Sequence, residues 1–265
     1  MYLSIRPILT AMCAIGLAGV TLTSPASATN FHSNWNKVDC DKGKSIQRRL
    51  DKAWPGQTIS VSGTCNESIV IEKDRTTLDC GSLGNASIIG TGGAVSTISI
   101  TARNVTISSC DVTAGDSTRI TISVLRGGSM ILEGNRISGA RNTVVAVQSS
   151  YARVIGNEIT SERNGVFVSS GSSADVVDNE IHNVINGVLV TNGASADIVG
   201  NTMTGSGTGF SPFGAGVFVS RASTGNFSND GTFGTAANTI QNFTRGIRCF
   251  DNSAVRFTRH GGTSR

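Results

Sequence analysis

A repeat of 22 residues runs through the middle of the chain and restricts its fold more than any other feature. Two series of asparagines keep this interval without error, one at Asn135, Asn157, Asn179 and Asn201, the other at Asn142, Asn164 and Asn186. Apolar residues recur in step with both series, as at Val144, Val166 and Val188. Chance does not bring so many columns into register, so each repeat is predicted to be one structural unit that stacks on the next.

Within each repeat, apolar and polar residues alternate over short stretches, as in ARVIGNEI and NGVFVSS. This alternation predicts short β-strands with one buried face. Three such strands with their turns form one coil, and successive coils rise by about 4.8 Å, the spacing of paired strands. The chain is therefore predicted to be all-β, a parallel β-helix solenoid. The asparagines are predicted to form structural ladders, because stacked side-chain amides hydrogen-bond along the axis and to turn backbone.

The cysteines indicate disulfides. Five of them lie beyond the first 28 residues, at Cys40, Cys65, Cys80, Cys110 and Cys249. The sequence alone does not assign the pairs, but proximity favours Cys40 with Cys65 near the N-terminal end, and Cys80 with Cys110 on successive coils. Cys110 falls in the asparagine column, so the second pair is expected to replace the ladder where it begins. Cys249 is left over.

Both ends of the chain differ from the repeat. Residues 1–28 carry an early cation, an apolar run and small residues ending at Ala28, which is typical of a signal peptide cleaved there and predicts a secreted or periplasmic protein. Residues 29–56 include GKSIQRRLDKAWPG, whose apolar Ile46, Leu50, Ala53 and Trp54 predict a short helix that caps the solenoid. The solenoid is expected over residues 57–258. Residues 259–265 form a polar tail, at which the chain is either truncated or capped by association.

Three features together resemble the right-handed parallel β-helix proteins of the pectate-lyase-like superfamily. They are the cap helix leading into PGQTISVSGTCNESIVI, the G/D-N-x-I ladders and the NGVxV strands. The resemblance covers residues 38–258 and implies a right-handed solenoid. Members of this superfamily include lyases, hydrolases, epimerases, tailspikes, adhesins and periplasmic binding proteins, so the resemblance does not select one activity. No catalytic signature of a member family is recognisable, and no active-site residue is carried over.

Function in a solenoid lies in outward columns and in insertions. One apolar column predicted to face outward consists of Val145, Phe167, Leu189 and Phe218, followed by Arg248. A second consists of Ile155, Val177 and Val199. Such stripes indicate either a covered face, formed by a loop or by a homo-oligomer, or a ligand surface on which sugars stack. Two Gly/Ser/Asn-rich insertions, the first of which contains Phe213, are expected to form loops that wall a groove beside the first column.

Arg153, Asp175 and Asp197 form a polar column in the same register. Its two carboxylates are expected to lie about one strand spacing apart. Three interpretations stay open: a shared Ca²⁺, the one cofactor candidate; the close carboxylates of a retaining glycosidase; or a solvated face that Arg153 partly balances. The solvated face is favoured. If the protein is an enzyme, Arg153 or Arg163 is predicted to neutralise a substrate carboxylate near Asp175 and Asp197.

The formal net charge of the chain is +4, from 22 basic and 18 acidic residues. This small excess indicates no nucleic-acid partner but permits an acidic polysaccharide. Beyond the signal peptide, no apolar segment is long enough to predict a membrane span. The favoured hypothesis is a secreted protein that binds polysaccharide, with cleavage or epimerisation left open. The alternative is a non-enzymatic structural or adhesive protein of the surface or periplasm.

Overall fold

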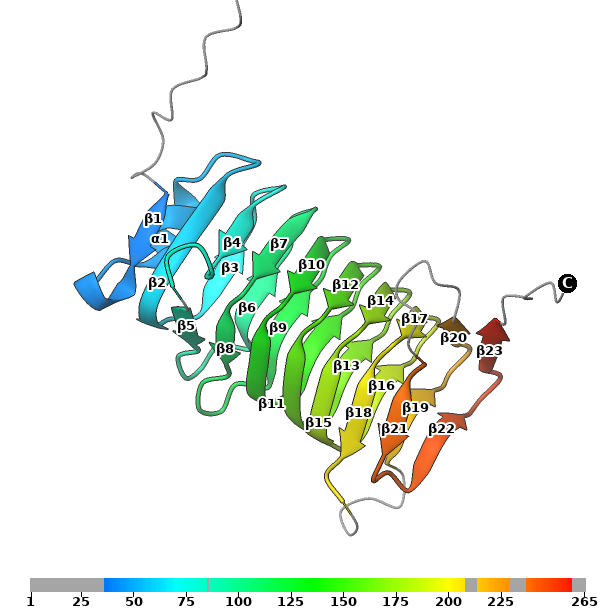
Figure 1. Cartoon of the computed structure of the whole chain (residues 1–265). Helices are drawn as coiled ribbons and strands as arrows, with labels where there is room; N and C mark the ends of the chain where they lie inside the picture. Colours follow the sequence, from blue (N-terminus) through cyan, green and yellow to red (C-terminus); the bar gives the residue numbers. More distant parts are fainter. Residues whose placement is uncertain (1–35, 85, 208–213, 229–236, 259–265) are drawn as a thin grey trace, which may run out of the picture. The chain divides into compact units, whose positions relative to one another are not determined.

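The computed structural model describes residues 36–84, 86–207, 214–228 and 237–258. These residues form a parallel β-helix, in which each strand pairs with the strand one coil away and lies parallel to it (Figure 1). The prediction of an all-β solenoid is confirmed. The predicted signal peptide, Phe213 and the polar tail lie outside the described residues. Within the described residues, no helix has the length and apolar character needed to cross a membrane.

Three stacks of strands, called here the first, second and third strips, make up the solenoid. The first strip consists of β1 (Lys37–Asp39), the beginning of β2 (Thr58–Asn66), β4 (Thr77–Asp79), β7 (Val105–Ser108), β10 (Ser129–Glu133), β12 (Tyr151–Ile155), β14 (Ser173–Val177), β17 (Ser195–Val199), β20 (Thr224–Ser228) and β23 (Ala254–Thr258). The second strip consists of the end of β2, β5 (Ala86–Ile89), β8 (Asp111–Thr113), the beginnings of β11 (Arg136–Ala146) and β13 (Glu158–Val168), β15 (Glu180–Val184), β18 (Thr202–Gly205) and β21 (Thr239–Gln241). The third strip consists of β3 (Ile69–Ile71), β6 (Ser96–Ile100), β9 (Ile120–Val124), the ends of β11 and β13, β16 (Asn186–Val190), β19 (Ala215–Val219) and β22 (Arg245–Cys249).

The 22-residue period appears directly in the register of the strands. Val154 pairs with Val176, which pairs with Ile198, and all three side chains are fully buried. Since neighbouring residues of a strand point to opposite faces, the residues on either side of each buried one face outward. The register therefore decides which side chains of each coil are available to a ligand.

The first asparagine ladder is buried at the turn between the first and second strips. The Asn157 side-chain amide donates to Oδ1 of Asn179 at 3.0 Å, and Asn179 donates in the same way to Asn201 at 2.9 Å. A fifth rung, Asn238, continues the file beyond Asn201. At its start, Oδ1 of Asn135 accepts a hydrogen bond from the backbone N–H of Cys110.

The second asparagine ladder precedes the strands of the third strip. Asn164 Nδ2 donates to Asn142 Oδ1 at 2.6 Å, and Asn186 Nδ2 donates to Asn164 Oδ1 at 2.8 Å. The donors of this ladder point toward the N-terminal end of the solenoid, opposite to those of the first ladder. It ends at the backbone N–H of Ala215, which donates to Oδ1 of Asn186.

A helix and two disulfides close the N-terminal end. The structure contains the disulfides Cys40–Cys65 and Cys80–Cys110, with Cα–Cα distances of 5.1 and 4.9 Å, so both favoured pairs are confirmed. The 3₁₀-helix η1 (Cys40–Lys42) and the helix α1 (Ile46–Asp51) cover the first coil. Cys249 is exposed and, within the described residues, is the cysteine that lies outside a disulfide.

The cap differs from the prediction at Trp54. Ile46, Leu50 and Ala53 are buried, but Trp54 is 79 % exposed. The reason is that α1 ends at Asp51, so Trp54 no longer follows helical spacing, and its backbone N–H donates to the Gln57 side chain instead. The sequence prediction also missed β1, which pairs with β2 ahead of the expected first strand.

The prediction that the second apolar column, Ile155, Val177 and Val199, forms an exposed stripe is wrong. Val177 and Val199 are buried, at 3 % and 0 % exposed, and only Ile155 keeps partial exposure. Val177 lies in register between Ile155 and Val199, about one strand spacing from each, so these branched side chains cover one another. This column therefore offers no apolar face to a partner.

Candidate functional site

The outward face of the third strip carries the first apolar column. Val166 and Val168 point into the core, so Phe167 between them points outward. Phe167 pairs in register with Leu189, which pairs with Phe218, and all three side chains are partly exposed. Val145 is only 2 % exposed, so the column begins at Phe167 as a surface feature. We call the surface around Phe167, Leu189 and Phe218 the groove face.

Close packing of the backbone supports this face. A glycine precedes the inward valine in each of three coils, at Gly165, Gly187 and Gly216. A Cβ atom at Gly187 would lie 2.6 Å from both the carbonyl oxygen of Gly216 and the sulfur of Met203. Real side chains do not tolerate such contacts, so the glycines allow the strands of the third strip to begin where they do.

Three arginines flank the N-terminal part of the groove face. Each comes one residue before a residue of the second asparagine ladder or its register partner, at Arg119, Arg141 and Arg163. Together with Asn142, Asn164, Phe167 and Leu189 they line a surface hollow. Arg163 was predicted as a site residue, whereas Arg119 and Arg141 were missed, although the three positions are also 22 residues apart.

A second hollow adjoins the first and shares Phe167 and Leu189 with it. Its other lining residues are Thr191, Asn192, Phe218, Ser220, Arg221, Arg248, Phe250 and Asp251. The Arg248 guanidinium lies 5.1 Å from the centre of the Phe218 ring and 4.9 Å from that of Phe250, so one face of Phe218 is already occupied. The two hollows adjoin at Phe167 and Leu189, the apolar residues that line both of them, and we refer to the pair of hollows as the groove.

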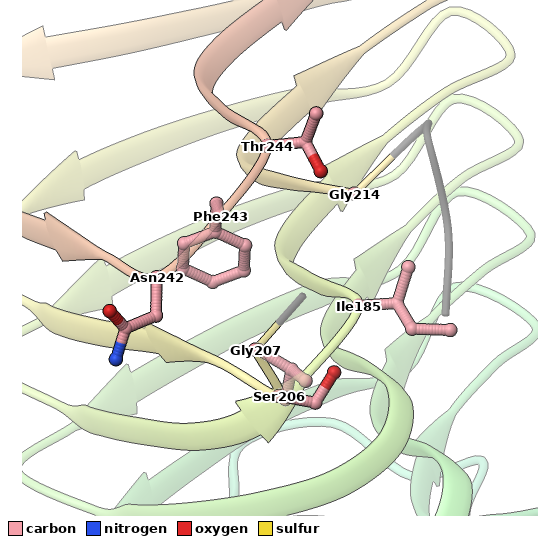
Figure 2. Close-up of a pocket in the computed structure, with 8 residues that line it drawn as sticks. Ile185, Ser206, Gly207, Gly214, Asn242, Phe243 and Thr244 are labelled. Atoms are coloured by element: carbon pink, nitrogen blue, oxygen red, sulfur yellow. The ribbon is translucent and has the colours of Figure 1, made fainter. Parts of the chain in front are cut away.

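A third, small hollow continues the arginine column toward the C-terminal end. Ile185 follows Arg163 in register, and Figure 2 shows Ile185, Ser206 and Phe243 around this hollow. Val184, Gly207, Gly214, Asn242 and Thr244 complete its lining. The Phe243 ring packs against Gly205, where a Cβ atom would lie 3.0 Å from it. The character of the column thus changes from cationic to apolar and neutral at Ile185.

The predicted polar column lies on a different strip. Arg153 pairs in register with Asp175 and Asp175 with Asp197, all on the outward side of the first strip. The hydroxyl of Tyr151 donates to Asp175 at 2.5 Å, and the side-chain amide of Asn226 donates to Asp197 at 2.6 Å. Sequence reasoning missed both of these partners, because each belongs to another coil and approaches its carboxylate diagonally or from beyond an insertion.

Tyr151 titrates unusually high because of this environment. Burial disfavours the charged phenolate, and the hydrogen bond to Asp175 favours the neutral hydroxyl, so the pKa of Tyr151 rises from its ordinary value of 10.0 to about 12. The charge of Asp175 contributes in the same direction, whereas that of Arg153 lowers the pKa. Tyr151 therefore remains a hydrogen-bond donor to Asp175 through the physiological range.

The structure corrects the prediction that Arg163 acts near Asp175 and Asp197. Arg163 lies at the start of the third strip, while both aspartates lie on the first strip. Between Arg163 and Asp175 the chain turns at residues 169–172, so outward side chains on the third and first strips leave the common core in different directions. Of the predicted catalytic residues, the structure brings together Arg153, Asp175 and Asp197. The predicted binding residues Phe167, Leu189 and Phe218 lie with Arg163.

The second strip carries one ion pair, Arg136 with Glu158, and one contact between a histidine and a carboxylate, among the described residues. Arg136 and Glu158 are 3.0 Å apart, and His182 lies 3.4 Å from Glu180. In the part of the chain that the structure describes, no group of three or more His, Cys, Asp or Glu side chains is arranged to hold a metal ion.

The fold agrees with that of known β-helix proteins. A family model described as a right handed beta helix region matches residues 79–233. Among solved structures, a pectin methylesterase from Yersinia enterocolitica is similar with a TM-score of 0.56 at 11 % identity, over 81 % of this chain and 94 % of that one. No curated protein sequence matches significantly.

Two further solved structures are similar with lower scores. A rice weevil pectin methyl esterase has a TM-score of 0.44 at 11 % identity, over 88 % of this chain and 91 % of that one. An alginate lyase from Paenibacillus sp. str. FPU-7 has a TM-score of 0.35 at 13 % identity, over 82 % and 98 % of the two chains. At these identities the likeness concerns the fold alone.

Proposed function

The chain belongs to the family defined by a right-handed β-helix region, and we propose that it is a carbohydrate-binding protein that holds an extended polysaccharide along the groove face. A parallel β-helix repeats the same surface in every coil, which suits a ligand that is itself a repeating polymer. Two confirmed disulfides accord with a protein that works in an oxidising compartment outside the cytoplasm.

The observation that carries the proposal is the partly exposed file of Phe167 and Leu189, which lines two adjoining hollows. Aromatic and apolar side chains provide flat surfaces against which the C–H faces of sugar rings pack. Exposed polar side chains line both hollows and are able to hydrogen-bond sugar hydroxyls, among them Arg141 in the first hollow and Arg221 and Asp251 in the second. An apolar surface with a few convergent polar groups is the usual composition of a ligand site.

Binding of the full chain to an array of polysaccharides tests the proposal. Phe167→Ala is expected to weaken binding by about five- to tenfold, the loss typical of one stacking contact. Trp54→Ala is the matched control, because Trp54 is also an exposed aromatic residue but lies at the N-terminal cap. Absence of binding to every polysaccharide, or equal binding by wild type and Phe167→Ala, would overturn the proposal.

Catalysis is a separate proposal that rests on the first strip. There Asp175 and Asp197 are adjacent carboxylates with Arg153 in the same file, an arrangement able to pair a base with a charge that neutralises a substrate acid. The polymer would then be cleaved or epimerised on the first strip, not in the groove. Wild type is expected to form reducing ends or unsaturated products if it cleaves the polymer, or to change the ratio of epimers in its NMR spectrum if it epimerises it. The double variant Asp175→Asn/Asp197→Asn is expected to lose this activity. A polymer left unchanged by wild type contradicts it.

Self-association is a second candidate function for the groove face, favoured by the same apolar file. A homo-oligomer would bury Phe167 and Leu189 against a second copy, as in structural or adhesive solenoids. Light scattering distinguishes the two. Wild type is then expected to be oligomeric and Phe167→Asp monomeric, whereas a monomeric wild type contradicts this alternative.

A further inference from the structure

The three arginines beside the groove form a ladder of their own. Asn142 pairs in register with Ile120 and with Asn164, so Arg119, Arg141 and Arg163 precede register partners in three successive coils. The register of β11 and β13 shifts between Ala140 and Asn142, so Arg141 stands opposite both Glu162 and Arg163. Backbone contacts fix the rungs: the Asn142 N–H donates to the Arg119 carbonyl and the Ile185 N–H to the Arg163 carbonyl. Arg119 and Arg141 are therefore about one strand spacing apart, ~4.8 Å, and Arg163 lies on the coil that follows Arg141, beyond the register shift.

No anion of the described structure compensates this ladder. All three side chains are exposed, and among the described residues no ion pair or side-chain hydrogen bond involves any of their guanidinium groups. Glu162, next to Arg163 in sequence, is exposed and makes no ion pair within the described residues. Like charges stacked directly across strands repel one another.

At two other places on the solenoid a stacked charge has a partner in the next coil. Arg136 is followed in its column by Glu158, with which it forms an ion pair, and Asp197 is followed by Asn226, which donates a hydrogen bond to it. The arginine ladder lacks such a neighbour, yet it borders the hollow that contains Phe167 and Leu189. A row of donors beside a sugar-stacking surface fits an acidic polymer.

We propose that the ligand of the groove is an anionic polysaccharide in which consecutive sugars carry an acidic group, and that Arg119, Arg141 and Arg163 each bind one of these groups. This inference rests on the proposed function, since it names the class of polymer held at the same face. An extended chain of pyranose sugars advances per residue by a distance comparable to the rise per coil. The polymer therefore runs along the solenoid axis with its acidic groups in step with the arginines.

The length of the arginine ladder also sets how many consecutive acidic sugars can be bound at the same time. Its next position is Ile185, followed in register by Gly214, and neither carries a charge. A run of three acidic sugars saturates the arginines, and a fourth in this direction meets the uncharged hollow around Ile185, Ser206 and Phe243. Affinity is expected to rise with the length of the acidic block up to three sugars and then to level off.

Calorimetric titration of the full chain with paired polymers tests this inference. One pair is a uronic acid homopolymer and its fully methyl-esterified form, which differ in charge but share a backbone. The other is sulfated dextran and dextran, which separates carboxylate from sulfate recognition. In one pair or both, the charged polymer is expected to bind at least tenfold more tightly than its neutral counterpart. Its affinity is expected to fall as the salt concentration rises, because salt screens the attraction between the charges.

The variants assign the effect to the ladder. Arg141→Gln removes the central charge and is expected to weaken binding of the charged polymer by about three- to tenfold, whereas Arg141→Lys retains most of it. Arg48→Gln is the matched control, because Arg48 is an exposed arginine on the cap helix. Thermal unfolding followed by circular dichroism shows that each variant is folded.

The outcomes separate the two proposals. Tight binding of the uronate, the sulfated polymer or both, weakened by Arg141→Gln alone, supports the ladder and identifies its anion. Equal affinity for charged and neutral forms, unchanged in Arg141→Gln, overturns the ladder while the groove remains a polysaccharide site. Binding to none of the four polymers or to any polysaccharide of the array overturns both.

Discussion

Asn157 gives two hydrogen bonds to the same atom of Asn179, one from its backbone N–H at 2.9 Å and one from its side-chain amide at 3.0 Å. Asn179 in turn donates to the carbonyls of Val154 and Val177 from its own amide. One side chain thus satisfies polar groups of two coils in a place that water does not reach.

Asn179→Ala is therefore expected to lower the free energy of unfolding by about 3 kcal/mol, because it leaves buried donors and acceptors without partners. Chemical denaturation measures the loss. Thr202→Ala, on the next coil but at an exposed position, serves as the control and is expected to change the stability by less than about 0.5 kcal/mol. Equal stability of both variants would show that the ladder is dispensable.

The glycine column permits a paired test at two positions of one register. Gly187→Ala places a methyl group against the Gly216 carbonyl and Met203, and is expected to cost about 2 kcal/mol of stability. At Gly246, which follows Gly216 in register, a Cβ atom meets nothing within 4 Å. Gly246→Ala is therefore expected to be tolerated, and thermal unfolding of the two variants provides the comparison. Similar melting temperatures would contradict this account of the third strip.

Glu67 anchors the cap helix to the first coil. Its carboxylate accepts hydrogen bonds from the Ser45 hydroxyl at 2.8 Å and from the backbone N–H groups of Ile46 and Gln47. Glu67→Ala is expected to cost about 1–2 kcal/mol and to increase amide hydrogen exchange in α1. Glu72→Ala, at an exposed acidic position nearby, is expected to leave both unchanged. Unaltered exchange in α1 of the Glu67 variant would show that the helix is held by its apolar face alone.

Tyr151 predicts a loss of stability in alkali. Its pKa is about 12 in the folded protein, whereas the unfolded phenol titrates at its ordinary value of 10.0. The protonated phenol is favoured by folding, so its contribution to stability is complete below pH 10 and is lost as the pH rises to about 12. The phenolate absorbance of wild type minus that of Tyr151→Phe measures this titration. In Asp175→Asn the midpoint is expected to fall, and an unchanged midpoint would remove the Asp175 hydrogen bond as a cause.

The period of the sequence was sufficient for the fold but not for every rung. Asn135 to Asn201 are spaced at one interval and could be predicted, whereas Asn238 follows Asn201 after 37 residues, because both insertions lie between them. Alternation also predicted the direction of Val145 and Val177 but not their burial. The direction of a side chain follows from its place in its own strand, whereas its burial depends also on the side chains of the neighbouring coils.

The candidate site was predictable only in part for the same reason. Phe167 and Leu189 could be identified from the strand pattern. Arg119 and Arg141 share the period, but only the structure shows that they line the same hollow as Phe167 and Leu189. Arg163 and Asp175 are close in sequence, but a turn separates them onto different strips. Which outward side chains share a strip depends on where the chain turns, and the alternation of residues within one strand does not predict this.

The opposite directions of the two asparagine ladders have an electrostatic consequence. In the file through Asn157 the amide donors point toward the C-terminal end, and in the file through Asn164 they point toward the N-terminal end. Aligned amides add their dipoles, as peptide groups do along a helix, so a single file would build up partial charge at its ends. The shorter, opposed file offsets part of this charge, so a solenoid of this kind can add coils with less partial charge at its ends.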